Sequence, residues 1–183
     1  MTVRPVGEAF PASNGMELDP RLHFVTVTGI IVKNDDDGEP KFLIAKRAPH
    51  EKAFPNKWTV PGGKLVRTEY ENLPKRPYAA GQKESTAPQW YEIVDWVLRK
   101  EIREEVGLEI EKPRYLTDLT FIRPDGYPVL TLSYWCRFKS GEVRLCKDLT
   151  DHSWATLEEA RNYDLIEGIW EELRDVRALL AMQ

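Results

Sequence analysis

The chain has 183 residues, of which 42% are hydrophobic and 31% charged, and its formal net charge is −4. This length predicts a single domain whose core needs neither disulfides nor a structural metal. The acidic balance argues against a nucleic-acid-binding protein, because such proteins carry basic surfaces. No apolar run approaches the ~20 residues that cross a bilayer, and the N-terminus lacks the apolar stretch of a signal peptide. We therefore expect a cytoplasmic protein without membrane contact, whose two cysteines, Cys136 and Cys146, are reduced.

The first third of the chain predicts an irregular arm followed by strands. Residues 1–20 contain several prolines and glycines without periodicity, so we expect the domain to occupy 21–183. A β-branched run at 23–33 predicts a strand, with a turn at 34–40 and a returning strand at 42–47. A loop at 48–57 precedes a short strand at 58–60, which stops at Pro61-Gly62-Gly63. This glycine pair allows a ligand to approach the backbone closely, or it makes an ordinary tight turn.

Residues 64–88 differ from their surroundings, because they are basic, contain aromatic side chains and show no periodicity. We expect an inserted long loop that includes at most one helical turn. Loops of this length inside a compact domain are usually functional or disordered. The basic side chains suit phosphate binding, and a solvated insertion is the alternative.

A long helix is predicted from about residue 89 to 106, after hydroxyl caps and a proline at 85–88. Strands are expected at 115–123, 129–138 and 142–146, separated by turns at 124–128 and 139–141. Thr156 followed by Glu159 is typical of a capping box and predicts a short helix that ends near residue 163. An apolar stripe predicts the last helix at about 167–182.

Three glutamates, Glu101, Glu104 and Glu105, share one face near the end of the long helix, because they stand at i, i+3 and i+4. Like charges at this spacing destabilise an isolated helix by roughly 0.2–0.5 kcal/mol per pair. A shared divalent cation would make the crowding favourable, since hard cations prefer oxygen ligands. Gly107 then indicates the end of the helix. The alternative is an acidic amphipathic helix that binds no metal.

The glycine pair and this acidic helix together resemble the signature of the Nudix hydrolases, G-x5-E-x7-R-E-U-x-E-E-x-G-U, in which U is aliphatic. Glu92 stands eight residues before Lys100, which occupies the arginine position. The positions that follow in register are Glu101, Ile102, Glu104, Glu105, Gly107 and Leu108. With Gly63 as the opening glycine, Glu92 requires an insertion of 23 residues, which corresponds to the basic loop. Lysine keeps the positive charge of the family's arginine but not its two-pronged geometry.

The resemblance implies an α/β protein, a Nudix-type α/β/α sandwich with a mixed, strongly twisted sheet. It implies a pyrophosphohydrolase that uses Mg²⁺ or Mn²⁺ and cleaves a diphosphate linkage in a nucleoside triphosphate or an ADP-ribose-like substrate. Either Glu101 or Glu104 would be the general base, and Glu92 and Lys100 would assist. The implied metal-site residues are Glu101, Glu104, Glu105 and a backbone carbonyl of Gly62 or Gly63.

Several further residues are candidates for substrate binding or for a base from a later loop. The basic candidates for the phosphates are Lys46, Arg47 and Lys64, with a surface location as the alternative. The candidate bases are Asp125, Asp148 and Asp151, for which a role in a turn or cap is the default. The aromatic candidates for stacking are Trp58, Tyr70, Tyr127 and Trp135, for which core packing is the default. Pro124 stands 16 residues after Leu108, similar to the proline that marks ADP-ribose pyrophosphatases.

Two rival hypotheses come from other functional classes. A Nudix-fold module could bind or sense a nucleotide with little or no catalysis, as the lysine at position 100 and the insertion would allow. A Nudix-type prenyl diphosphate isomerase would need a cysteine and a glutamate on opposite sides of the substrate's carbon skeleton, and no motif in the sequence indicates such a pair. The expected partner is a small-molecule nucleotide, and a homodimer is compatible with the family.

Overall fold

The computed structural model describes residues 19, 21–34, 38–74, 88–123 and 126–182. The expected irregular arm therefore lies almost entirely outside the described residues. The same is true of Pro124, Asp125 and the hydroxyl caps at 85–87.

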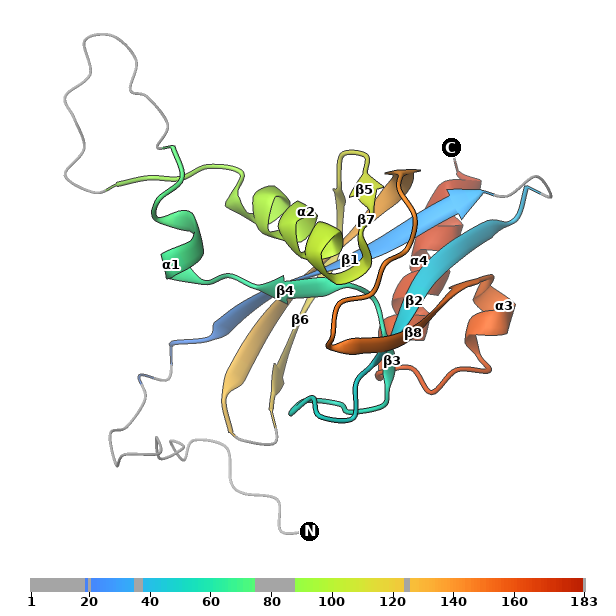
Figure 1. Ribbon diagram of the computed structural model, residues 1–183, viewed down its shortest axis with the longest axis horizontal. Coiled ribbons are helices and arrows are strands. Elements are labelled where there is room, and N and C mark those ends of the chain that lie inside the picture. Colours follow the sequence, from blue (N-terminus) through green and yellow to red (C-terminus); the bar gives the residue numbers. More distant parts are fainter. Residues whose placement is uncertain (1–18, 20, 35–37, 75–87, 124–125, 183) are drawn as a thin grey trace, which may run out of the picture.

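One mixed, twisted sheet forms the centre of the molecule, with β3-β2-β1-β7-β5 as its main strand order (Figure 1). In addition, β4 pairs with β1, β6 pairs with β7 and β8 pairs with β2. The pair of β1 and β7 is parallel, and the other strand pairs are antiparallel. The strands are β1 (Phe24–Asn34), β2 (Pro40–Arg47), β3 (Trp58–Thr59), β4 (Gly62–Lys64), β5 (Glu109–Ile110), β6 (Arg114–Ile122), β7 (Pro128–Ser140) and β8 (Leu149–Ala155).

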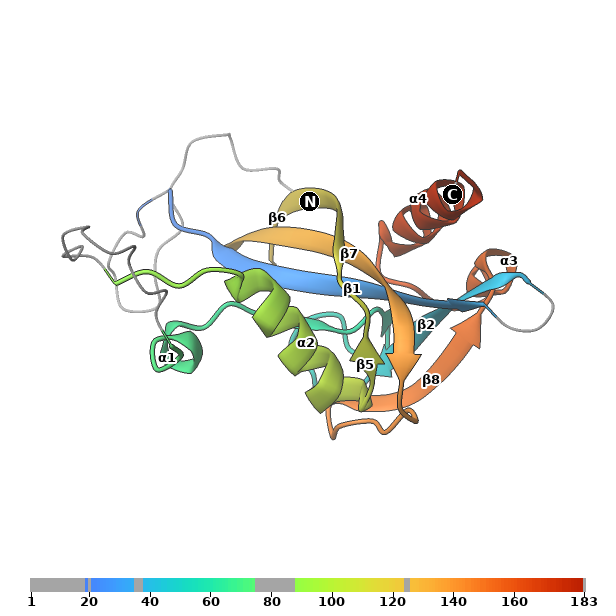
Figure 2. The same ribbon diagram turned by 90° about the horizontal axis from the view of Figure 1, so that it is seen from above.

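Helices cover both faces of this sheet, which confirms the predicted α/β/α sandwich. Helix α2 (Ile93–Val106) lies on one face, and α3 (Leu157–Ala160) and α4 (Ile169–Ala181) lie on the other (Figure 2). Side chains of β1 alternate between the two layers, as expected for a strand buried on both faces. Val27 and Ile31 belong to the core beneath α2, whereas Ile30 and Val32 belong to the core beneath α4.

Local sequence signals account for the ends of several elements. At the C-terminus of α2, Gly107 adopts φ 72° and its N–H donates to the carbonyl of Arg103 at 3.1 Å. Thr156 and Glu159 form the predicted capping box, with bonds of 3.2 and 2.9 Å.

No helix in the described part of the chain combines the length and apolar character that a membrane crossing requires. The thiols of both cysteines are free, as expected.

The long helix starts later than its sequence predicts. It begins at Ile93, and Glu92 is its N-cap residue, with a left-handed φ of 57° and no side-chain capping bond. A left-handed residue interrupts the helical backbone, so the apolar stripe cannot extend the helix back to residue 89. In the described part of the basic segment, which excludes residues 75–87, one helical turn is present as α1 (Arg67–Tyr70).

The prediction of a strand at 142–146 is wrong. The N–H groups of Arg144 and Cys146 donate to the carbonyls of Val106 and Glu105, each at 2.9 Å, so this segment caps the C-terminus of α2. Strand β8 was not predicted, because its centre reads Thr-Asp-His-Ser and lacks an apolar alternation. Its position is set by pairing with β2 rather than by local propensity.

Candidate functional site

The glycine pair lies in strand β4, between β1 and α2, and not in the tight turn that was the alternative interpretation. Gly62 pairs with Thr28, and Gly63 pairs with Val27. A Cβ atom on Gly62 would lie 2.2 Å from the carbonyl oxygen of Val27, and one on Gly63 would lie 2.1 Å from Cδ of Glu101. Glycine is therefore required because the backbone approaches β1 on one side and a helix glutamate on the other.

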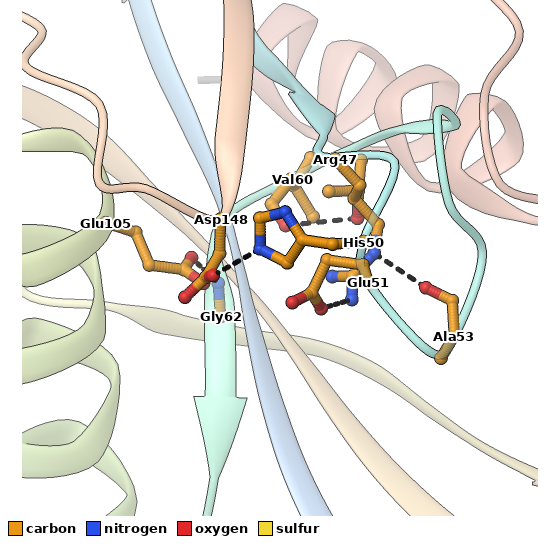
Figure 3. A network of polar contacts seen from close by, with 9 residues as sticks. Arg47, His50, Glu51, Ala53, Val60, Gly62, Glu105 and Asp148 are labelled. Atoms are coloured by element: carbon orange, nitrogen blue, oxygen red, sulfur yellow. Dashed lines mark hydrogen bonds and ion pairs between the residues drawn. The ribbon is translucent and has the colours of Figure 1, made fainter.

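The Glu105 carboxylate is held against this glycine strand. Its Oε2 accepts a hydrogen bond of 2.9 Å from the N–H of Gly62 (Figure 3). Burial penalises the ionised carboxylate and raises the pKa of Glu105 to about 7. The Gly62 N–H acts in the opposite direction, and the negative charge of Glu101 adds to the increase. The ionised form of Glu105 is thus disfavoured by its burial, and a nearby cation would stabilise that form.

Lys100 contacts three further glutamates, of which two lie on the same helix. Its Nζ lies 3.1 Å from Oε1 of Glu101, 3.2 Å from Oε2 of Glu104 and 3.3 Å from Oε2 of Glu69. Burial opposes the charge of Lys100, but these carboxylates outweigh it and raise its pKa. An ammonium group has three N–H donors, so it can serve three carboxylates at once. The Glu101 side chain is 17% exposed and the Glu104 side chain 59%, so Glu104 points towards solvent.

Sequence reasoning missed Glu69, the third partner of Lys100, which belongs to α1. Glu69 stands six residues after Gly63, which is the G-x5-E spacing of the Nudix signature. Glu92 satisfies the E-x7-R spacing of that signature, and it was predicted to be the signature glutamate on that basis. The structure places Glu92 at the exposed N-cap of α2. If Glu69 is the first glutamate of the signature, the insertion lies between Glu69 and Lys100. Residues 70–99 then stand where the E-x7-R part of the signature has seven residues.

A cavity of about 620 Å³ lies beside the glycine strand and contains part of the predicted site. Its polar end is lined by Gly62, Gly63, Lys64, Glu69, Glu101 and Glu105. Arg47 also lines the cavity, and its charge acts on Glu105. Lys46 is not among the lining residues, because neighbouring strand residues point to opposite faces. Of the predicted phosphate-binding residues, the cavity therefore brings together Arg47 and Lys64.

The loop after β2 adds an ionic network next to Glu105 (Figure 3). His50 Nε2 lies 2.9 Å from Oδ1 of Asp148, and this contact lowers the pKa of Asp148. The negative charge of Asp148 in turn acts on Glu105. Within the described residues, His50, Glu51 and Asp148 are the one group of three metal-type ligands whose atoms lie within 4.8 Å of one another. The three helix glutamates do not converge that closely, because Glu101 and Glu104 contact Lys100 whereas Glu105 contacts Gly62.

The remaining candidates divide between the site and the core. Asp148 is the later-loop aspartate that approaches the helix glutamates, whereas Asp151 accepts a bond of 2.8 Å from the N–H of His152. Trp58 packs edge-on against Tyr163 in the core next to α4, and Trp135 is a buried member of the same core cluster. The aromatic side chains that line the cavity are instead Phe24, Phe54 and Phe121, which sequence reasoning did not select.

Comparison with known proteins identifies the fold. No family model matches the chain, and no curated protein sequence matches it significantly. Solved structures match most of its length, and they are Nudix and MutT proteins. The chain therefore has the Nudix fold, as the resemblance in its sequence predicts.

Three of these structures illustrate the breadth of the match. A MutT protein from Methanosarcina mazei is 19% identical, with a TM-score of 0.61 over 88% of this chain and 99% of the other. The Nudix domain of Shewanella oneidensis NrtR, solved with ADP ribose, is 16% identical, with a TM-score of 0.64 over 89% and 94%. An Ap4A hydrolase from C. elegans is 18% identical, with a TM-score of 0.60 over 87% and 99%.

Proposed function

We propose that this protein is a divalent-cation-dependent pyrophosphohydrolase that cleaves a phosphoanhydride bond in a nucleoside diphosphate derivative. The observation that supports it most directly is the contact of Glu105 and Glu101 with the glycine pair on a Nudix fold. The solved neighbours include an Ap4A hydrolase and a domain in complex with ADP ribose, which agrees with a nucleotide substrate.

The residues at the polar end of the cavity fit a hard divalent cation. Carboxylates and carbonyls are the oxygen ligands that Mg²⁺ and Mn²⁺ take. Of the residues that the resemblance implies, Glu101, Glu105, Gly62 and Gly63 line the cavity and would hold the cation, whereas Glu104 lies outside this lining. The raised pKa of Glu105 supports this set, since its buried charge gains from a nearby cation. When bound, such a cation neutralises phosphate oxygens and makes water a better nucleophile.

The chain's own residues would orient the substrate, accept the proton and position the base. Arg47 and Lys64 line the cavity with positive charge and would orient the diphosphate. A carboxylate takes the proton of the water that attacks phosphorus, and the phosphoanhydride oxygen leaves with the second phosphate product. Glu101 lines the cavity whereas Glu104 does not, which favours Glu101 as this base. Glu69 and Lys100 would hold Glu101 in position, so Glu69 takes the bracing role that the signature spacing assigned to Glu92.

A second candidate function is a Nudix-fold module that binds a nucleotide without efficient turnover. The observation that favours it is the Lys100 ammonium, which already neutralises Glu101 and Glu104 and competes with a cation for them. Tight nucleotide binding by calorimetry, together with no product from any substrate, would support this module.

The experiment that tests the hydrolase is incubation with a substrate panel in the presence of Mg²⁺ or Mn²⁺. The panel includes nucleoside triphosphates, ADP-ribose and dinucleoside polyphosphates. We expect cleavage of at least one member and loss of cleavage after chelation of the metal. A full panel without cleavage would overturn the proposal.

A further inference from the structure

The cavity has a second end, the aromatic end, which is formed by Phe24 of β1, Phe54 of the loop after β2 and Phe121 of β6. Phe24 is 43% exposed and Phe54 is 38% exposed, although large apolar side chains are more often buried. Three segments that are distant in sequence thus bring phenylalanine rings to one opening. An exposed aromatic cluster inside a cavity is typical of a ligand-binding surface.

The backbone conformation of Phe54 indicates that the loop is built to present this ring. Phe54 has a φ of 54°, in the left-handed region that bulky residues rarely adopt. Such a conformation costs about 1–3 kcal/mol and persists only where the surrounding structure imposes it. Arg47 imposes it here, because its Nε donates to the carbonyl of Ala53 at 2.9 Å and its guanidinium pairs with Glu51 (Figure 3). The N–H of Lys57 closes the turn on the carbonyl of Phe54 at 3.3 Å.

The Phe54 and Phe121 rings at the aromatic end contact each other without lying face to face. The centroids of Phe54 and Phe121 are 6.4 Å apart, and their planes are inclined by 56°. The two rings therefore contact each other at a tilt, and Phe54 keeps 38% of its surface exposed to a ligand. The guanidinium carbon of Arg123 lies 5.8 Å from the Phe24 ring centroid and adds a cation at the same opening.

We propose that the aromatic end binds the planar base of a nucleotide, stacked on Phe54 and flanked by Phe121. The diphosphate of the same molecule would then lie at the polar end, beside Glu101 and Gly63; this placement rests on the proposed function. A base presents apolar ring faces, and stacking on an aromatic side chain contributes about 1–3 kcal/mol. The cavity of about 620 Å³ accommodates both parts of such a ligand, since small-molecule sites occupy about 300–1,000 Å³.

Calorimetry of the full-length protein in the presence of EDTA tests this proposal without any hydrolysis. The two probes are AMP and ribose 5-phosphate, which differ only in the base. The variants are Phe54→Leu, which keeps apolar bulk but removes the ring, Phe54→Ala, and Phe54→Tyr, which keeps the ring. The matched control is Ile122→Ala, because Ile122 is 59% exposed on the same strand as Phe121 but does not line the cavity. Thermal unfolding establishes that each variant is folded.

We expect the wild type to bind AMP more tightly than ribose 5-phosphate. Phe54→Leu and Phe54→Ala should weaken AMP binding about tenfold, whereas Phe54→Tyr and Ile122→Ala should not change it. Binding of ribose 5-phosphate should be equal in all variants. Wild-type affinity for AMP in Phe54→Leu, or a wild type that does not distinguish the two probes, would overturn the proposal. Because no bond is cleaved, a protein that fails to hydrolyse nucleotides still gives a result on the base site.

Discussion

Replacement of Gly63 by alanine separates the geometry of the site from the stability of the fold. The new Cβ would lie 2.1 Å from Cδ and 2.4 Å from Oε1 of Glu101, whereas ordinary contacts begin at 3.4 Å. The carboxyl group must therefore move by about 1 Å, which a flexible side chain can do without unfolding the protein. A displacement of about 1 Å in a reacting group can lower a rate about 100-fold. We expect Gly63→Ala to keep most of its stability and to lose about 100-fold in turnover.

The neighbouring Gly62 supplies the matched control. A Cβ at Gly62 would lie 2.2 Å from the carbonyl oxygen of Val27 and 2.8 Å from Cα of Thr28, and both atoms are backbone. Backbone atoms cannot rotate away, so β4 must separate from β1, at a cost of about 3 kcal/mol. Urea unfolding and steady-state hydrolysis, measured on both variants, distinguish the two effects. Wild-type turnover in Gly63→Ala, or wild-type stability in Gly62→Ala, would refute this reasoning.

Four further predictions concern charged residues in α2 and next to it. Glu69→Gln should reduce turnover at least tenfold, because it removes one carboxylate that holds Lys100. Glu92→Gly should raise the unfolding free energy by about 0.5–1 kcal/mol, because glycine tolerates the left-handed backbone at this position. The pKa of Glu105 is raised to about 7, so the folded state binds more protons, and metal-free stability should fall by about 3 kcal/mol as pH rises from 4.5 to 8. Lys100→Met should cost about 2 kcal/mol, because it leaves its carboxylates without their cation.

The measurements for these four predictions are hydrolysis rates and urea unfolding of the metal-free protein. Normal turnover in Glu69→Gln, with a loss in Glu92→Gly, would restore Glu92 as the bracing residue. A Glu105→Gln variant should lack the decline in stability between pH 4.5 and 8, and an unchanged slope would assign that decline to another group. Lys100→Met as stable as the wild type would mean that solvent already screens the ion pairs.

The elements that the sequence predicted correctly are those with strong local signals. The β-branched run of β1, the apolar stripe of α2 and the capping box at Thr156 each indicate their element from local residues alone, although distant residues complete the packing. Strand β8 could not be recognised, since its polar centre is ordered by pairing with β2. The segment 142–146 has a strand-like composition, but its N–H groups satisfy the end of α2 instead.

The candidate site was predicted in its helix and only in part elsewhere. The positions of Glu101, Glu104 and Glu105 follow from helical periodicity, so their common location could be predicted. Glu69 was available from its spacing to Gly63, but two glutamates satisfied different halves of one signature, and only the contact with Lys100 distinguishes them. The exposed ring of Phe54 depends on a left-handed backbone that no propensity indicates.

The most direct test of the proposed hydrolase is a comparison of Glu105→Gln with Glu109→Gln. Glu105 contacts the glycine strand at the cavity, whereas Glu109 lies just beyond the same helix and binds Arg103 at 2.7 Å. Turnover of the cleaved nucleotide and Mn²⁺ affinity by electron paramagnetic resonance are measured on both variants. We expect Glu105→Gln to lose at least 100-fold in turnover together with Mn²⁺ affinity, and Glu109→Gln to match the wild type. Equal turnover and equal Mn²⁺ affinity in Glu105→Gln and the wild type would contradict the account.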